Sequence, residues 1–156
     1  MPDLLVNLLK LPPLDNSDQQ DFIIRRAQPF EITPIRTFVA QNFSQSWADE
    51  ISVGFARQPV SVFVATINHE LVGFAGYECT RRGFFGPTGV IQTAQSKGIG
   101  KALLLASLLA LRELGYVYAI IGAAGPVRFY QKTVDAIIIP DSEPGIYTDL
   151  LKKPDS

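Results

Sequence analysis

The sequence predicts a mixed α/β fold, and three observations support that prediction. The chain has 156 residues, 47% of them hydrophobic, which suits one compact domain with a sizeable core. In the second half, runs rich in β-branched and aromatic residues alternate with helical segments, a pattern typical of α/β proteins. In the first half, residues 61–67 and 71–80 flank the short segment Asn68-His69-Glu70. These two runs predict a hairpin, so part of the sheet must be antiparallel.

The residues ahead of the hairpin predict one strand and two helices. The expected strand covers residues 22–26 and runs out into charge at its end. A helix is expected over residues 29–43, with its start limited by Pro34. A second, short helix is expected over residues 47–55, where Gly54 helps to end it.

The residues after the hairpin predict alternating strands and helices. In chain order they are a strand over residues 83–90, a helix over 98–114, a strand over 116–121, a short helix over 126–133, and strands over 136–139 and 146–151. Gly115 is the usual stop signal after a helix, and Pro126 suits the first helical position. Glycines and Pro87 interrupt the strand that begins at Gly83, which predicts a bulge or a bend.

The domain is expected to span residues 21–151, after an N-terminal extension over residues 1–20 and before a charged tail over residues 152–156. Pro12-Pro13 and the polar residues that follow mark the first boundary. No signal peptide is expected, because a basic segment and a small-residue cleavage site are missing. The longest apolar stretch, Ala102 to Leu111, is far shorter than the roughly 20 residues of a transmembrane helix.

Charge and cysteine content exclude several classes of function. Fourteen Lys and Arg against fifteen Asp and Glu give a net charge of −1, so no overall field attracts nucleic acid or an anionic membrane. The one cysteine, Cys79, cannot form an internal disulfide or a cysteine-based four-ligand zinc site, and no metal site is predicted. We therefore expect a cytoplasmic protein that binds neither nucleic acid nor membrane.

The segment Gln95-Ser96-Lys97-Gly98-Ile99-Gly100-Lys101 is the most informative motif, and it lies where a strand leads into a helix. Its glycines allow a tight turn and a close approach to amide groups, which lack internal partners at a helix N-terminus. Lys97 and Lys101 lie at the positive end of the helix dipole, where a cation is disfavoured unless an anion is bound. The segment therefore predicts a site for a polyphosphate.

Two familiar phosphate motifs do not fit this segment. A Walker P-loop that ends at Gly100-Lys101 needs glycine where Gln95 stands and Ser or Thr where Ala102 stands. The dinucleotide fingerprint needs glycine or alanine where Leu103 stands. Neither a nucleoside triphosphatase nor a Rossmann domain is expected, and a site for some other nucleotide is a remote alternative.

The remaining pattern is Q-x-x-G-x-G at the start of a helix, and on it the chain resembles the GNAT superfamily of acyl-CoA-dependent N-acetyltransferases. In that family the segment holds the CoA pyrophosphate on successive backbone amides, so the resemblance implies acetyl-CoA bound at residues 95–101. Val90 lies where the family's splayed fourth strand meets the pantetheine arm, and Phe129-Tyr130-Gln131-Lys132 looks like its F-Y-x-K element.

The resemblance covers about residues 22–150 and implies a mixed, mostly antiparallel central sheet with flanking helices. It also implies a cleft between the splayed fourth and fifth strands. The chain departs from the family's common pattern at Gln92, where the family often has proline, and at Val134-Asp135, where it often has Gly-Phe. Asparagine, frequent in the family near residues 122–125, is missing here as well.

Two residues are the candidates for proton transfer. Tyr130 matches a tyrosine that often acts as general acid in the family, since a phenol with a pKa of about 10 is protonated at neutral pH. The alternative is a half-buried aromatic residue that only packs its helix. Glu78, expected on the strand beside apolar neighbours, is a candidate general base that acts through a water, or else a solvated charge at the strand end.

Aromatic residues are the candidates for the acceptor pocket. Phe84 and Phe85, beside Gly86-Pro87, are the preferred pair, with Trp47 and Tyr147 as further candidates, although all four are also suited to a core. His69 is expected to be exposed in the hairpin turn and Cys79 to be a buried structural residue. Neither is expected to act in catalysis.

The expected function is direct transfer of an acetyl group from acetyl-CoA to a primary amine of a small molecule or peptide. Positioning and polarisation of the thioester carbonyl by a backbone amide near Val90 would provide most of the catalysis. The alternative is a non-catalytic acyl-CoA sensor or interaction module that kept the pyrophosphate site. Assembly as a homodimer stays open.

Overall fold

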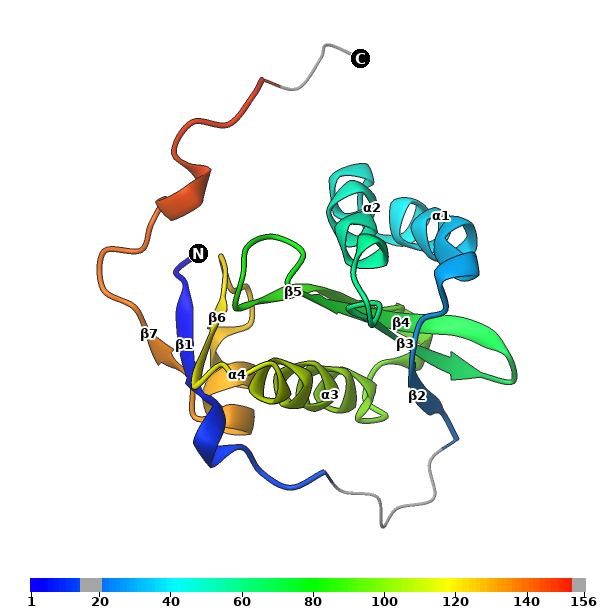
Figure 1. Ribbon diagram of the computed structural model, residues 1–156, viewed down its shortest axis with the longest axis horizontal. Coiled ribbons are helices and arrows are strands. Elements are labelled where there is room, and N and C mark those ends of the chain that lie inside the picture. The colour runs from blue at the N-terminus through cyan, green and yellow to red at the C-terminus, as the bar shows by residue number, and fades with distance from the viewer. Residues whose placement is uncertain (15–20, 153–156) are drawn as a thin grey trace.

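The structure, a computed structural model, describes residues 1–14 and 21–152 (Figure 1). Its centre is a seven-stranded sheet in the order β2-β3-β4-β5-β6-β1-β7. The strands are β1 Leu4–Asn7, β2 Ile23–Arg26, β3 Val62–Ile67, β4 Glu70–Tyr77, β5 Phe84–Val90, β6 Tyr118–Ile121 and β7 Ile137–Ile138. Neighbouring strands are antiparallel except β5 and β6, which are parallel. The predicted mixed, mostly antiparallel sheet is confirmed.

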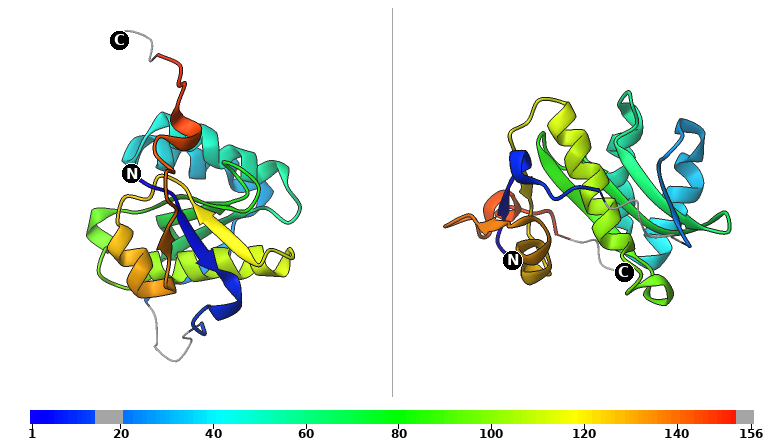
Figure 2. Two further views of the ribbon diagram at one scale, coloured as in Figure 1. Left: turned by 90° about the vertical axis from the view of Figure 1, so that its left-hand side faces the viewer. Right: turned by 90° about the horizontal axis from the view of Figure 1, so that it is seen from below.

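Helices cover both faces of the sheet. They are α1 Ile32–Asn42, α2 Gln45–Ser52, α3 Ile99–Glu113 and α4 Val127–Val134. Figures 1 and 2 show α1 and α2 on one face and α3 with α4 on the other. Two cores follow from this layering, one centred on the apolar side of α3, with Leu103, Leu104 and Leu108, and one under α1 and α2, with Ile35 and Phe74.

The N-terminal residues are part of the sheet, which corrects the expected extension over residues 1–20. Strand β1 pairs with β6 on one side and with β7 on the other. Leu4 and Val6 are fully buried in the α3 core, while Leu5 and Asn7 are only half-buried. This alternation is the signature of a strand, but only its antiparallel partners 110 or more residues later show that it is an interior one.

The predicted last strand over residues 146–151 is wrong, because this segment forms a 3₁₀ helix at Gly145–Tyr147 instead. A strand needs a free edge to pair with, and β1 already fills the position beside β6. Asp141 and Gly145, each with a φ of 58°, also turn the chain just before this segment. The segment after β7 therefore leaves the sheet and runs along the outside of the domain toward α2 (Figures 1 and 2).

The predicted hairpin is confirmed as β3 and β4. Asn68 and His69 both have positive φ, 51° and 68°, which two-residue hairpin turns require. His69 is exposed there, as expected. Strand β4 ends at Tyr77, so Glu78 lies one residue beyond the strand on which the sequence placed it, with a φ of 60°.

Strands β5 and β6 separate soon after they meet, and this separation positions the site. Among the described residues, only Phe84 and Phe85 of β5 pair with β6. Gly86, with a φ of 122°, begins the predicted bulge, and the register against β4 shifts there. Residues 86–90 continue beside β4, and no strand of the described part of the chain pairs with their other side. Counted from β2, strands β5 and β6 are the fourth and fifth strands. Their separation is the expected splay.

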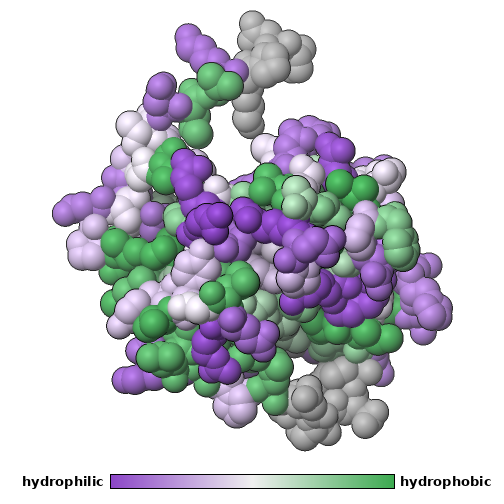
Figure 3. All heavy atoms as spheres, viewed as in Figure 1, coloured by the Kyte–Doolittle hydropathy of each residue, from purple (hydrophilic) through white to green (hydrophobic). Residues whose placement is uncertain are grey.

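The surface shown in Figure 3 mixes hydrophobic and hydrophilic residues, with no broad apolar face on that side. Within residues 1–14 and 21–152, no helix combines the length and the apolar character needed to cross a membrane.

Candidate functional site

The N-terminus of α3 has the geometry of an anion site. Gly98 caps the helix with a φ of 84°, and the first intrahelical bond runs from the Ala102 N–H to the Gly98 carbonyl. The N–H groups of Ile99, Gly100 and Lys101 precede that bond and have no intrahelical acceptor. They point out of the helix end with the positive end of its dipole behind them.

Space around this helix end is open. A Cβ at Gly98 would meet no atom within 4 Å, and one at Gly100 would meet only the Cγ2 of Val90, at 4.0 Å. Lys97 and Lys101 are exposed, and neither forms a salt bridge with another described residue. The exposed amides, the open approach and the two free cations fit a pyrophosphate group.

Val90 lies directly beside this helix end. The Gln95 side chain donates from Nε2 to the Val90 carbonyl over 3.3 Å, and the Val90 side chain faces Gly100. The structure thus brings together Val90 and the predicted segment 95–101. Strand β5 connects this position with the bulge at Gly86, at its other end.

A cavity of about 460 Å³ lies at that other end, where β5 and β6 part. One wall is the start of β5, from Phe84 to Pro87, and the opposite wall is the β6–α4 loop at Gly122 and Ala123. Helix α2 and the 3₁₀ helix of the C-terminal segment provide the other walls. Its size is that of a pocket for a small molecule.

All four aromatic candidates for the acceptor pocket line this cavity, but their side chains differ in burial. Trp47 is 37% exposed and stacks on Phe43 at 5.7 Å between ring centroids. Phe84 is half-buried and lies against Gly122, whereas Phe85 is 3% exposed and belongs to the α3 core. Successive β5 side chains therefore divide between cavity and core, as the alternation of a strand requires.

Tyr130 lies behind Phe85, on the α3 side of the sheet. The two rings meet edge to face with centroids 6.4 Å apart. Burial raises the pKa of the Tyr130 phenol to about 12. No described residue forms a hydrogen bond with its hydroxyl, so burial alone accounts for the raised pKa. Phe85 is the residue that connects Tyr130 with the cavity wall.

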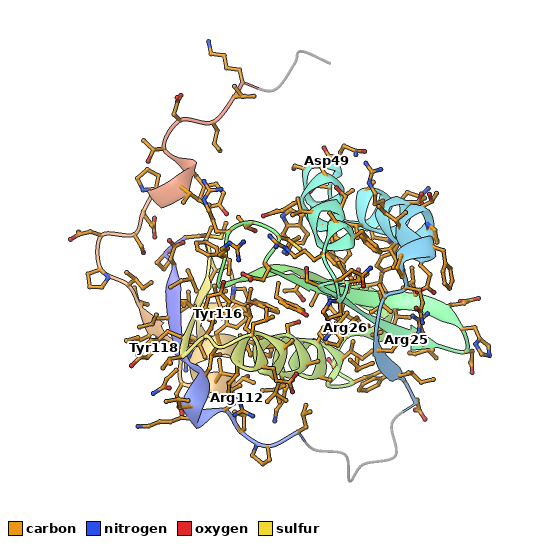
Figure 4. The ribbon with its side chains drawn as sticks, viewed as in Figure 1. Arg25, Arg26, Asp49, Arg112, Tyr116 and Tyr118 are labelled. Atoms are coloured by element: carbon orange, nitrogen blue, oxygen red, sulfur yellow. The ribbon has the colours of Figure 1, made fainter. Side chains whose placement is uncertain are left out.

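Glu78 is buried, but its carboxylate belongs to the β4–β5 turn and not to the cavity wall. The Gly83 N–H donates to its Oε2 over 2.5 Å, and the Tyr116 hydroxyl donates to Oε1 over 3.0 Å. Tyr116 lies in the connection that leads into β6 (Figure 4). These two donors hold the turn between β4 and β5 closed, which explains why the Glu78 carboxylate is buried there. The sequence pattern did not indicate this role.

Sequence reasoning missed the polar residues of the cavity. Glu50 and Thr80 line it and are joined by a hydrogen bond from the Thr80 hydroxyl to Glu50 Oε2. Glu143 lines it from the C-terminal segment. Glu50 follows Trp47 by three residues on α2, and this helical spacing was the available signal that both share a face.

The buried cysteine is not part of the site. Burial raises the pKa of the Cys79 thiol to about 11, and its Sγ donates to the Tyr77 carbonyl over 3.5 Å. Such a thiol is inert at neutral pH, in agreement with the structural role expected for it.

Known proteins similar to this chain share its fold. The acetyltransferase (GNAT) family matches residues 23–134. A glucosamine N-acetyltransferase region of a fungal multi-domain β-N-acetylglucosaminidase aligns with a TM-score of 0.71 at 15% identity, over 88% of this chain and 19% of that one. An N-acetyltransferase from Sphaerobacter thermophilus aligns with a TM-score of 0.68 at 16% identity, over 88% of this chain and 48% of that one.

A GNAT acetyltransferase from Brucella melitensis, solved in complex with acetyl-CoA, aligns with a TM-score of 0.57 at 20% identity, over 71% of this chain and 80% of that one. This chain thus spans about a fifth and about half of the length of the first two structures. No curated protein sequence matches it significantly. Because the family match covers most of the sequence and the fold agrees, the chain belongs to the GNAT family of acetyltransferases.

Proposed function

We propose that the protein transfers an acetyl group from acetyl-CoA to a primary amine of a small molecule or peptide. One observation carries the proposal: the unpaired edge of β5 leads from the open helix end at Gly98 to the cavity at Phe84. Residues 86–90 span about 13 Å at the usual rise of a strand. An extended chain laid on this edge would have its phosphates at α3 and its far end at the cavity.

Acetyl-CoA would bind at the N-terminus of α3 and along strand β5. The N–H groups of Ile99, Gly100 and Lys101 would donate to the pyrophosphate oxygens, with Ser96 and Lys97 beside the phosphates. Gln95 would hold the turn against β5. The free backbone groups of β5 up to Val90 would pair with the pantetheine arm, as an added strand does. When bound, the cofactor supplies the activated acetyl thioester and a thiol leaving group.

The protein's own groups would position the reaction and move one proton. The cavity walls would hold the amine against the bulge at Gly86, where the strands part. Tyr130, with a pKa of about 12, keeps its proton at neutral pH and would deliver it to the departing sulfur. The proton that the amine nitrogen loses on forming the amide would then restore the phenol. Glu78 has a structural explanation in the turn, so no base is assigned from it.

Two glycines at opposite ends of α3 give a matched test of cofactor binding. Gly98 and Gly115 have φ angles of 84° and 106°, and neither has an atom within 4 Å of its Cβ position. Alanine at either position costs about 1–2 kcal/mol of strain. Only Gly98→Ala adds a methyl group at the proposed site.

Calorimetry should find that Gly98→Ala weakens acetyl-CoA binding by about tenfold or more, while Gly115→Ala leaves it within about twofold of wild type. Equal affinities in the three proteins would overturn the site. Turnover is then tested by a screen of amines with detection of free thiol. Binding without turnover on any amine would favour the acyl-CoA sensor instead.

A further inference from the structure

The cavity is lined by carboxylates as well as by aromatic rings. Glu50 and Glu143 both line it, and among the described residues in its walls the one cationic group is the amino group of Met1. Glu143 lies 3.0 Å from the amino group of Met1. Glu50 has no salt-bridge partner among the described residues and is therefore the carboxylate that remains open to a cation.

Glu50 is also held in one place. The Thr80 hydroxyl donates to its Oε2, and no described residue donates to Oε1. The carboxylate is half-buried on the inner side of α2, three residues after Trp47. The Thr80 hydroxyl occupies one oxygen of the carboxylate, so the other oxygen is free to accept from a further donor.

Three aromatic rings share the cavity with this carboxylate: Trp47 from α2, Phe84 from β5 and Tyr147 from the C-terminal segment. Aromatic faces attract cations and cover apolar carbon chains. The pKa of Tyr147 is raised by its burial and by the charges of Glu50 and Asp3, which Arg81 opposes in part. Arg81 is exposed, donates to the Thr80 carbonyl and is not a wall residue.

From this arrangement we propose that the cavity selects cationic amines with an apolar, preferably aromatic, body, and that Glu50 is the residue that determines this specificity by binding the ammonium group. The inference rests on the proposed function, because it names the acceptor class of the same site. It disfavours acceptors with a carboxylate next to the amine, because Glu50 would repel that group and Glu143 already pairs with the amino group of Met1.

Binding can be measured without any cofactor or turnover, because Trp47 is the one tryptophan of the chain and lies in the cavity wall. The probes are phenethylamine, its neutral analogue 2-phenylethanol and its anionic analogue 3-phenylpropionate, each titrated against Trp47 fluorescence. We expect phenethylamine to bind about tenfold or more tightly than the alcohol, the size expected for one charge-assisted hydrogen bond. The acid should bind most weakly.

The decisive variant is Glu50→Gln, which keeps the shape of the side chain and an acceptor for Thr80 but removes the charge. Asp49→Asn is its matched control, because it removes the same charge from the next residue of α2. The Asp49 side chain is 63% exposed, pairs with Arg36 and points outward from the helix (Figure 4). Glu50→Gln should lower phenethylamine affinity by about tenfold and leave that of the alcohol unchanged.

Asp49→Asn should change the affinity of neither probe by more than about twofold. The inference is overturned if wild-type protein binds the alcohol as tightly as the amine, or if Glu50→Gln and Asp49→Asn behave alike. The wild-type comparison holds even if the Glu50 variant does not fold. Charge-selective binding in a protein that binds no acetyl-CoA would leave the inference standing and refute the proposed function. Acetyl-CoA binding with no preference among the probes would do the reverse.

Discussion

The Tyr116 hydroxyl lies 3.0 Å from the Glu78 carboxylate and donates to it, joining the segment before β6 to the turn that follows β4. Partial burial and the nearby carboxylate raise the pKa of this phenol, so it remains a donor at neutral pH. The Tyr116 ring also packs on Gly83, whose N–H is the second donor to Glu78. Three residues from two segments thus close the turn that begins β5.

Glu78→Gln is therefore expected to reduce stability and to leave turnover nearly intact. Loss of charge-assisted hydrogen bonds at a buried site costs about 1–3 kcal/mol. Urea unfolding of Glu78→Gln, Tyr116→Phe and the double variant should give non-additive losses, because the first change weakens and the second removes the same hydrogen bond. A fall in kcat by about a hundredfold with unchanged unfolding free energy would instead identify Glu78 as a general base.

Tyr130→Phe should keep the affinity for acetyl-CoA and lower kcat by about 10²–10⁴-fold, as is typical when a general acid is removed. The ring, which packs on Phe85, is retained in this variant, so the fold should not change. Steady-state kinetics with the best amine from the screen, together with calorimetry, measure both quantities. Unchanged kcat across pH, with chemistry limiting the rate, would leave Tyr130 a packing role only.

The same residue gives a pH-dependent stability. Its pKa is about 12 in the folded protein, because burial disfavours the phenolate, and about 10 when unfolded. The folded state therefore holds the proton more tightly, so its contribution is complete below pH 10 and is lost as the pH rises to 12. The loss amounts to about 3 kcal/mol relative to Tyr130→Phe. Between pH 8 and 11.5, the urea midpoint of the wild-type protein should fall relative to that of Tyr130→Phe; parallel curves would contradict the buried phenol.

Phe84 and Phe85 should respond differently to alanine. Phe84 faces the cavity, so Phe84→Ala should raise the acceptor KM with little effect on acetyl-CoA affinity. Phe85 is 3% exposed in the α3 core, so Phe85→Ala should reduce the free energy of unfolding by about 3–5 kcal/mol. Urea midpoints and steady-state constants on both variants check this. If the two variants behave alike, the acceptor site must be sought elsewhere along the cavity, at Trp47 or Tyr147.

A free-thiol assay suits these measurements because the protein's own thiol does not interfere. Cys79 is buried and its pKa is raised to about 11, so it holds almost no thiolate at pH 8. Thiol detected in the native protein's reaction is therefore released CoA.

Much of the fold was predictable because it depends on features local in the sequence. The hairpin follows from two residues that accept positive φ between alternating strands, and the anion site follows from Gly98, whose φ of 84° an L-residue adopts only with strain. The start and end of α3 likewise follow from glycines that flank an apolar run. Backbone sterics and periodicity act over a few residues, so a single sequence contains this information.

The rest depends on partners distant in the chain. Leu4–Asn7 looks like an isolated apolar segment until Tyr118–Ile121 and β7 supply the hydrogen bonds that make it an interior strand. Glu50 and Thr80 are 30 residues apart and meet only because α2 packs beside the bulge that starts β5. The electrostatics of the cavity, on which the proposed acceptor class rests, arise from side chains that no local spacing connects. They are set by how the strands pair and by where the helices pack on them.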